Sequence, residues 1–305
     1  MNLPSSVLAE LWGIPGALER SSSGVSRATW RAAEGYWLTC CEVRRESAFR
    51  RECALLANLG ETLAAHHELA LAVPTLVPTV TGEVVPAREG FLWRLSRHLA
   101  GSHPVMNDPA SYELMVHVLV RVHQALDLVR DRCPGCPDVL GRVRARLNAL
   151  GQLSLTAEEG EVLPAAADWL RARIGRLDAF PTRLVHGDWT PSNVLVGPTG
   201  SAGILDFEEC GLGPAIYDFA NICSTLLMWS GLDNVGKRMA WLVGVIEENL
   251  GAALDEEMVQ TAMLAHWFGQ YFDWRERTST SENSQVLDRL RGRVQTVLRW
   301  RWTQD

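Results

Sequence analysis

One stretch, residues 184–209, constrains the fold and the chemistry of this chain more than any other. It reads LVHGDWTPSNVLVGPTGSAGILDFEE and contains two short apolar runs, Asn193–Val196 and Gly203–Leu205. The segment between them, Gly-Pro-Thr-Gly-Ser, is typical of a turn, so the stretch predicts a β-hairpin. The two ends of a hairpin lie close together. We therefore expect the polar residues on either side of it to meet.

Three of these polar side chains suit phosphoryl transfer. Asp188 and Asn193 precede the hairpin, and Asp206 follows it. Carboxylate and amide oxygens that converge are suitable ligands for Mg²⁺. An Asp, then an Asn, then a second Asp beyond the hairpin is also the order found in a kinase catalytic loop. The pattern predicts Asp188 as the catalytic residue and Asn193 and Asp206 as the magnesium ligands.

The segments HGDWTPSN and ILDFEECGLGPAIYDFA resemble the aminoglycoside phosphotransferase and choline kinase family, which is related to the protein kinases. The matching positions are His186, Gly187, Asp188, Asn193, Asp206, Gly211, Gly213 and Asp218. A polar hairpin in an ordinary α/β domain is the simpler alternative, but it does not account for so many matched positions. Pro214 departs from the pattern, because the family usually has Asp there.

The resemblance implies a protein-kinase-like α+β fold with two lobes. An N-terminal antiparallel sheet with a helix, residues 1–98, would bind the nucleotide. A larger, mostly helical lobe, residues 99–305, would carry catalysis and acceptor binding, with a hinge at about residues 95–101. The implied cofactors are ATP or GTP together with Mg²⁺. Because the hinge reads the base largely with backbone atoms, both nucleotides stay open.

Further residues take supporting roles by the same resemblance. We expect His186 to brace the catalytic loop and Asp218 to bond back to it. Glu208 lies two residues after Asp206, where it could reach the metal or face the acceptor. In the hinge, Arg97 and His98 are expected to lie beside the nucleotide base.

The N-terminal part contains a small-residue loop that we expect to cover the phosphates. Its candidate nucleotide-binding residues are Ser23, Gly24 and Ser26. Backbone N–H groups of such a loop can approach phosphate oxygens closely. The pattern then predicts a strand over Tyr36–Cys41 and a helix over Glu46–Leu63.

In the resembled family this strand carries a basic residue that holds the phosphates, and the helix carries a Glu that holds the basic residue. Glu52 matches the Glu, but Thr39 stands at the basic position. Two explanations stay open. Either Arg27, Arg44 or Arg45 reaches the phosphates by another route, or nucleotide binding is weak.

The remaining sequence predicts helices. Asp108 is a good N-cap, and Thr156 with Glu159 forms a capping box that opens a helix. We expect Pro164 to interrupt this helix, which resumes to about Leu177. Gly251 is a good C-cap. The other predicted helices are Ser5–Leu11, Val139–Leu150, Ala215–Trp229, Asn234–Leu250, the segment from Asp255 to about Arg277, and Ser281–Trp302.

The composition excludes several classes of function. The net charge of −7 arises beyond residue 98, which disfavours nucleic acid and is compatible with a cationic acceptor. No apolar run approaches the ~20 residues of a membrane span. The N-terminus lacks the features of a secretory signal, so we expect a cytoplasmic protein. Cys133 and Cys136 have the spacing of half a zinc site, but no second pair or His cluster in the sequence completes it.

Three functions are compatible with this pattern. The first is an O-phosphotransferase acting on a small-molecule hydroxyl, such as that of an antibiotic, an amino alcohol or a sugar, in antibiotic resistance or biosynthesis. The second is a kinase that phosphorylates Ser or Thr of a peptide natural-product precursor. The third is a kinase-like binding module without catalysis, which Thr39 motivates. The joint presence of Asp188, Asn193 and Asp206 favours an enzyme. Nothing in the sequence indicates an oligomeric state.

Overall fold

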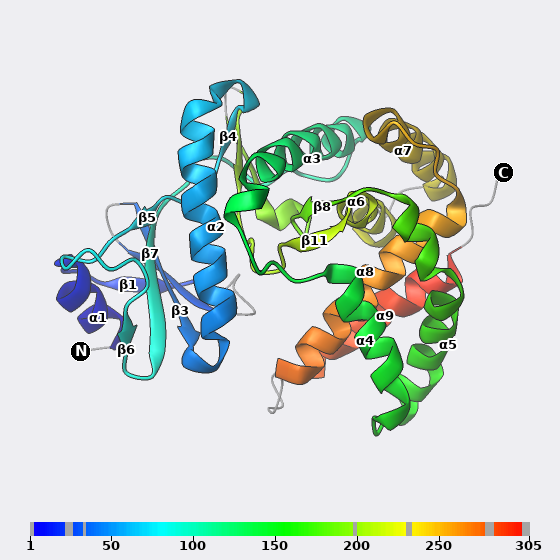
Figure 1. Cartoon of the computed structure of the whole chain (residues 1–305), viewed down its shortest axis with the longest axis horizontal. Coiled ribbons are helices and arrows are strands. Elements are labelled where there is room, and N and C mark those ends of the chain that lie inside the picture. Colours follow the sequence, from blue (N-terminus) through cyan, green and yellow to red (C-terminus); the bar gives the residue numbers. More distant parts are fainter. Residues whose placement is uncertain are drawn as a thin grey trace. The chain divides into compact units, whose positions relative to one another are not determined.

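The computed structural model describes residues 3–21, 27–32, 35–197, 200–229, 234–277 and 284–300. The chain divides into two compact units, each made of discontinuous segments (Figure 1). The first comprises Met1–His103, Leu128–Pro134 and Asn193–Glu208, and the second comprises Pro104–Asp127, Gly135–Ser192 and Glu209–Asp305. Because the hairpin after Asn193 groups with the first unit, the two units are not separated at a single point in the sequence. The boundary at residue 98 stays a prediction. Among the described helices, none has the length and apolar content needed to cross a membrane.

An antiparallel sheet forms the centre of the first unit. Its strand order is β1–β2–β3–β7–β5, and β6 pairs with β7. The strands are β1 Leu18–Arg20, β2 Ala28–Ala32, β3 Tyr36–Glu42, β5 Leu76–Val77, β6 Ala87–Arg88 and β7 Phe91–Arg97. The predicted strand at residues 36–41 is confirmed. Strands β6 and β7 form a tight hairpin, in which Glu89 and Gly90 between them both adopt positive φ.

Helices cover the two faces of this sheet. On one face, Leu38 and Leu95 pack with Val7 and Leu8 of α1 (Leu3–Trp12). On the other face, Leu92 packs with residues of α2 (Glu46–Ala65), the helix predicted at residues 46–63. Because side chains alternate along a strand, Thr39 and Arg94 share the face of Leu92. They are also direct cross-strand partners.

The predicted hairpin is present in the first unit. Its strands are β9 (Val194–Val196) and β10 (Ala202–Ile204), which pair antiparallel. The short strand β4 (Leu71–Ala72) adds to β10 in parallel and completes a three-stranded sheet.

Helices dominate the second unit. They are α3 Pro109–Val129, α4 Val139–Ala149, α5 Ala157–Arg173, α6 Ile216–Trp229, α7 Val235–Leu250, α8 Glu256–Arg277 and α9 Ser284–Arg299. Helix α8 packs against α4, α5, α6 and α9, so it forms the centre of the unit. A two-stranded ribbon of β8 (Thr182–Val185) and β11 (Gly211–Pro214) completes it.

The predicted helix ends are confirmed at several positions. The Asp108 carboxylate accepts a hydrogen bond from Ser111 N at 2.9 Å, and the capping box of Thr156 and Glu159 is complete. Gly251 ends α7 with a φ of 66°. The interruption expected at Pro164 is wrong, because α5 runs through it unbroken. Packing of α5 against α8 and α9 outweighs the one lost backbone hydrogen bond.

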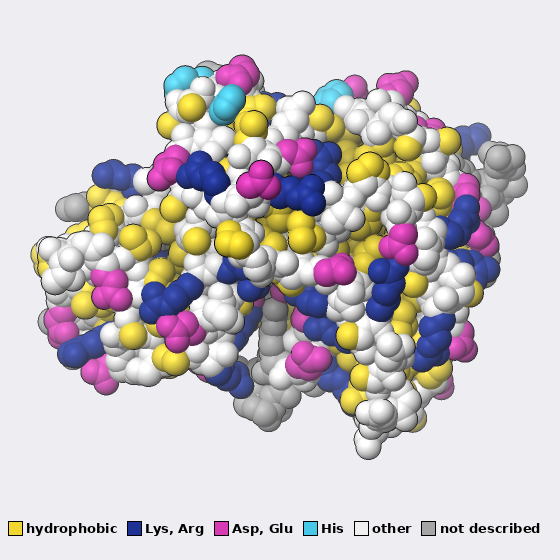
Figure 2. Space-filling view, in the orientation of Figure 1, with side chains coloured by type: hydrophobic (Ala, Val, Ile, Leu, Met, Phe, Trp, Pro, Cys, Tyr) yellow, Lys and Arg dark blue, Asp and Glu magenta, His cyan; other side chains and the backbone are white. Residues whose placement is uncertain are grey.

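The surface carries charges of both signs. On the face drawn in Figure 2, Arg side chains alternate with Asp and Glu, and no large basic patch gathers there. Nucleic-acid binding proteins instead gather Lys and Arg on one face.

Candidate functional site

Asp218 organises the loop that carries Asp188. The loop follows β8, and its first two backbone amides, those of His186 and Gly187, donate to the two carboxylate oxygens of Asp218 at 2.7 and 2.8 Å. His123 of α3 binds the same carboxylate, with 2.8 Å between Nε2 and Oδ2. Asp218 is fully buried. These bonds fix the start of the loop from α3 and α6.

The ionisation of Asp218 follows from these contacts. Burial raises the pKa of its carboxyl group, but the hydrogen bond and charge of His123, with the backbone amide of Gly187, lower it further than burial raises it. Asp218 is therefore a carboxylate at neutral pH and accepts bonds with both oxygens.

Gly187 turns the chain tightly before Asp188. Its φ is 86°, and a Cβ there would lie 2.2 Å from the carbonyl oxygen of Glu209. Asp188 follows with a half-buried side chain, and its backbone N–H donates to His186 Nδ1 at 3.3 Å. His186 is fully buried and packs edge-on against Trp189, with 5.4 Å between ring centroids. His186 thus lies where a brace of the loop would lie.

A cation on the last helix faces this loop. The pKa of Arg293 in α9 is lowered by burial, and the Asp188 carboxylate opposes this effect. The guanidinium lies 4.3 Å from the centre of the Trp267 ring. No sequence pattern near Asp188 predicts Arg293, because the two residues are far apart along the chain.

The hairpin of the first unit brings Asn193 and Asp206 together. Val194 pairs with Ile204, and one residue further out the Leu205 N–H donates to the carbonyl of Asn193 at 2.9 Å. Asp206 is therefore the first residue beyond the hydrogen-bonded part of the hairpin. Its φ of 56° is unusual for a residue other than glycine. Such backbone conformations concentrate at functional sites.

The donors at this hairpin end fit a magnesium ion that also binds phosphate. Asn193 is buried and Asp206 is exposed. No group of three or more His, Cys, Asp or Glu side chains that could hold a metal occurs among the described residues. Mg²⁺ in kinase sites is held by one or two protein oxygens, with the remaining ligands from phosphates and water. Asn193 and Asp206 match that requirement.

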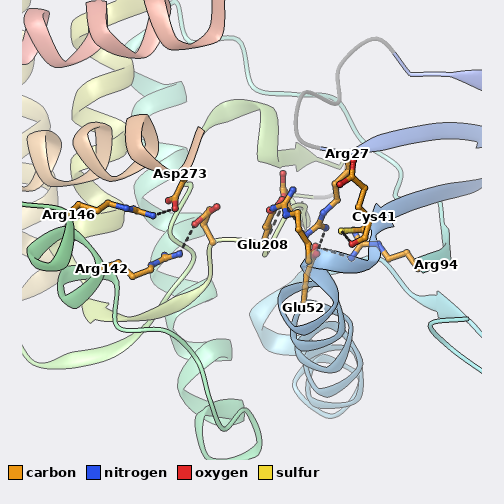
Figure 3. A network of polar contacts seen from close by, with 12 residues as sticks. Arg27, Cys41, Glu52, Arg94, Arg142, Arg146, Glu208 and Asp273 are labelled. Atoms are coloured by element: carbon orange, nitrogen blue, oxygen red, sulfur yellow. Dashed lines mark hydrogen bonds and ion pairs between the residues drawn. The ribbon is translucent and has the colours of Figure 1, made fainter. Parts of the chain in front are cut away.

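Glu52 has two arginine partners in the first unit, and neither lies on β3 (Figure 3). Arg27, directly before β2, donates to Oε2 of Glu52, and Arg94 of β7 lies 3.0 Å from Oε1. Both guanidinium groups lie over the Phe49 ring. The basic partners of Glu52 therefore come from β7 and from the residue directly before β2, and not from position 39.

Burial and charge act in opposite directions at Glu52. Burial raises the pKa of its carboxyl group, while Arg94 and Arg27 lower it to about 2. Burial likewise lowers the pKa of Arg27, but the carboxylates of Glu52 and Asp206 raise it above the ordinary value. All three groups are charged at neutral pH.

Glu208 binds two arginines of the same unit. Its carboxylate lies 3.3 Å from Arg27 Nη2 and forms an ion pair with Arg45. The side chain is largely buried. The metal and acceptor roles expected for Glu208 do not involve these contacts. The two ion pairs connect the segment after Asp206 to the cluster around Glu52.

The other predicted nucleotide-binding residues either lie outside the described residues or bond within the first unit. Ser23, Gly24 and Ser26 lie outside the described residues. The amides of Arg97 and His98 donate to the carbonyls of Thr75 and Gly35 at 2.9 and 2.7 Å. These two N–H groups are thus engaged within the first unit.

A second charged cluster lies in the second unit. Arg142 of α4 donates to Glu209 at 3.1 Å, and Arg146 pairs with Asp273 of α8 (Figure 3). Burial and the Glu209 carboxylate raise the pKa of Asp273, and Arg146 opposes them. The Asp273 side chain is only 12% exposed and ion-paired, so it does not belong to a solvated helix face.

Comparison with known proteins shows which family the sequence matches. Residues 18–267 match the model of the phosphotransferase enzyme family. No curated protein matches the sequence. Several solved structures share the fold at low sequence identity.

An amicoumacin kinase, hAmiN, in complex with AMP-PNP, Ca²⁺ and Ami aligns with a TM-score of 0.67 and 16% identity over 97% of this chain and 94% of its own. The aminoglycoside phosphotransferase APH(4)-Ia, in a ternary complex with AMP-PNP and hygromycin B, gives 0.65 and 14% over 98% of each chain. A microcompartment-associated aminopropanol kinase gives 0.64 and 15% over 97% and 94%. The chain belongs to the phosphotransferase enzyme family.

Proposed function

We propose that this phosphotransferase uses ATP or GTP with Mg²⁺ to phosphorylate a hydroxyl group of a small molecule. The observation that carries the proposal is the braced loop before Asp188, in which Asp218 accepts both leading amides. A loop fixed in this way presents Asp188 in one orientation. Fixed orientation is most of what a phosphotransferase contributes to its reaction.

Asp188 is the proposed base. Its half-buried carboxylate would accept or orient the proton of the attacking hydroxyl. His186 is buried against Trp189, so it would position the loop rather than carry protons. Asp218 would hold the loop without taking part in the chemistry.

Asn193 and Asp206 are the proposed magnesium ligands, because their backbones are joined at the open end of the hairpin. When bound, Mg²⁺ would neutralise charge on the nucleotide phosphates. The similar structure of an amicoumacin kinase holds AMP-PNP and Ca²⁺, which supports a nucleotide and a divalent cation here.

The proposed acceptor is an antibiotic, an amino alcohol or a sugar. The neighbours named above include an amicoumacin kinase and an aminopropanol kinase. The enzyme's expected location is the cytoplasm, where nucleotide is available. The acidic groups Glu209 and Asp273 are already paired with arginines, which favours an acceptor with few positive charges over a polycation.

The test is nucleotide turnover by the wild-type chain and an Asp188→Asn variant. We would measure phosphate transfer from ATP and from GTP to a panel of hydroxyl acceptors, together with the slow transfer to water. The wild type should transfer phosphate with Mg²⁺ present. Asp188→Asn should lose about 10²- to 10⁴-fold in rate, the usual contribution of a general base.

The variant should melt at the wild-type temperature, because Asn has nearly the same shape and the side chain is half-exposed. Equal rates in the two proteins would disprove the role of Asp188. A wild type that transfers phosphate to neither acceptor nor water would disprove the proposed activity.

A further inference from the structure

Position 39 raises a question that the first unit answers. A phosphate-binding cation on β3 would be held by Glu52, but Thr39 has no charge. Glu52 nevertheless keeps its place, is 2% exposed, and binds Arg27 and Arg94. One buried carboxylate between two arginines leaves an excess positive charge, which Glu208 beside Arg27 offsets. Such an excess is stable only where another anion lies near it.

Arg94 is largely buried, with 12% of its side chain exposed, and its Nε, like that of Arg27, has no hydrogen-bond partner among the described residues. It lies opposite Thr39 in the middle of the sheet. Its guanidinium lies 5.2 Å from the Phe49 ring centre, and Nη1 is 3.9 Å from Cys53 Sγ. These contacts with α2 make Arg94 the structural partner of Glu52.

Arg27 has a different setting. In the sequence it directly follows the small-residue loop 22–26 and precedes β2. Its guanidinium binds Glu52 and also lies 3.3 Å from Glu208. The Asp206 carboxylate contributes to its raised pKa. Arg27 thus spans the distance from Glu52 to the hairpin end that carries the proposed metal ligand.

Arg27 also retains capacity for another oxygen. Its side chain is only 6% exposed, and its Nε donor has no hydrogen-bond partner within the part of the chain that the structure describes. A buried donor without an acceptor is costly. A phosphate oxygen near Asp206 would satisfy this donor, since guanidinium and phosphate form strong hydrogen bonds.

We propose that Arg27 is the cation that binds the nucleotide phosphates in this chain, in place of a basic residue at position 39. The proposal rests on the proposed function, since it requires a nucleotide. Glu52 holds Arg27 in position, and Glu208 lies 3.3 Å from Nη2 of the same guanidinium. The nucleotide would then displace Glu208 from Arg27.

The experiment is calorimetric titration of the full chain with AMP-PNP and with adenosine, each with Mg²⁺. Arg27→Gln should weaken AMP-PNP binding by about tenfold or more, the usual worth of a hydrogen bond to a charged group. Adenosine, which lacks phosphates, should bind to the variant and the wild type alike. Arg27→Lys should recover most of the AMP-PNP affinity.

Arg44→Gln is the matched control. Arg44 belongs to the same unit and has the same charge, but its side chain is 64% exposed and pairs with Glu42. It should bind AMP-PNP like the wild type, which separates a local contact from a change in net charge.

Three outcomes would overturn the inference. Arg27→Gln could bind AMP-PNP as tightly as the wild type, or it could lose AMP-PNP and adenosine in equal proportion. Either result removes Arg27 from the phosphates and leaves the proposed function standing. A wild-type chain that binds no nucleotide overturns the proposed function and this inference together.

Discussion

Glu52 is the residue at which burial and charge conflict most strongly. It lies in the core of the first unit with Arg27 and Arg94, and only their charges keep it ionised. Replacing an apolar cluster with such a network is rarely a gain in stability. A network that holds a cation ready for a ligand explains why the charges are there.

This conflict predicts a pH dependence. The folded chain lowers the pKa of Glu52 from 4.5 to about 2, so the ionised carboxylate stabilises the fold above pH 4.5. The difference corresponds to about 3 kcal/mol at neutral pH. Glu52→Gln should lose about that much unfolding free energy at pH 7. The loss should shrink as the pH falls from 4.5 toward 2, because the wild-type carboxylate is then protonated as well.

Urea unfolding at a series of pH values measures this. Glu46→Gln is the control on the same helix, since Glu46 is exposed and pairs with Arg50 along the surface. It should change stability by less than about 0.5 kcal/mol. A Glu52→Gln deficit that stays constant down to pH 2 would contradict the account.

At the scale of elements, the β8–β11 ribbon sets the position of the Asp188 loop. Gly187 leaves β8 against the backbone of Glu209, which leads into β11. Gly187→Ala should therefore destabilise the chain through both the positive φ and a clash with a carbonyl oxygen. We expect a loss of about 3 kcal/mol or more in unfolding free energy.

Gly251→Ala separates the two causes. Gly251 also has a positive φ, of 66°, but a Cβ there would have no atom within 4 Å. It should lose only about 1 to 2 kcal/mol, the cost of the left-handed conformation alone. Equal losses at the two glycines, measured by urea unfolding, would show that the ribbon is not tightly packed at Gly187.

Local sequence patterns predicted many of these elements correctly. The turn residues between two apolar runs predicted the hairpin β9–β10, and the capping box of Thr156 and Glu159 predicted the start of α5. The helix break expected at Pro164 is wrong, because the rule for interior prolines takes no account of the packing of α5. The pattern of a helix start is local, whereas its continuation depends on tertiary contacts.

The partners of Glu52 could be narrowed but not assigned from sequence. The sequence leaves Arg27 as one of three candidates for the missing cation, and no pattern in it indicates Arg94. The pairing of Thr39 with Arg94 is a matter of strand register, which joins segments far apart in the sequence. No local pattern near position 39 reveals which strand carries the charge on the same face.

At the scale of the whole molecule, the chain consists of two units built from discontinuous segments. Its most informative residues are few: Asp188 in the second unit, and Asn193 and Asp206 in the first. The family match spans residues 18–267 and so includes all three. The roles proposed for these residues share one requirement, which is that the chain binds its nucleotide through a divalent cation.

The most direct test is calorimetric titration of AMP-PNP with Mg²⁺ and with EDTA, for the wild type and for Asp206→Asn. Asn tolerates the positive φ at position 206, so this variant keeps the backbone and removes the charge. The account predicts that Mg²⁺ strengthens wild-type binding by about tenfold or more, and that Asp206→Asn abolishes this gain. Wild-type binding that is the same with and without Mg²⁺, or an undiminished Mg²⁺ effect in the variant, would contradict it.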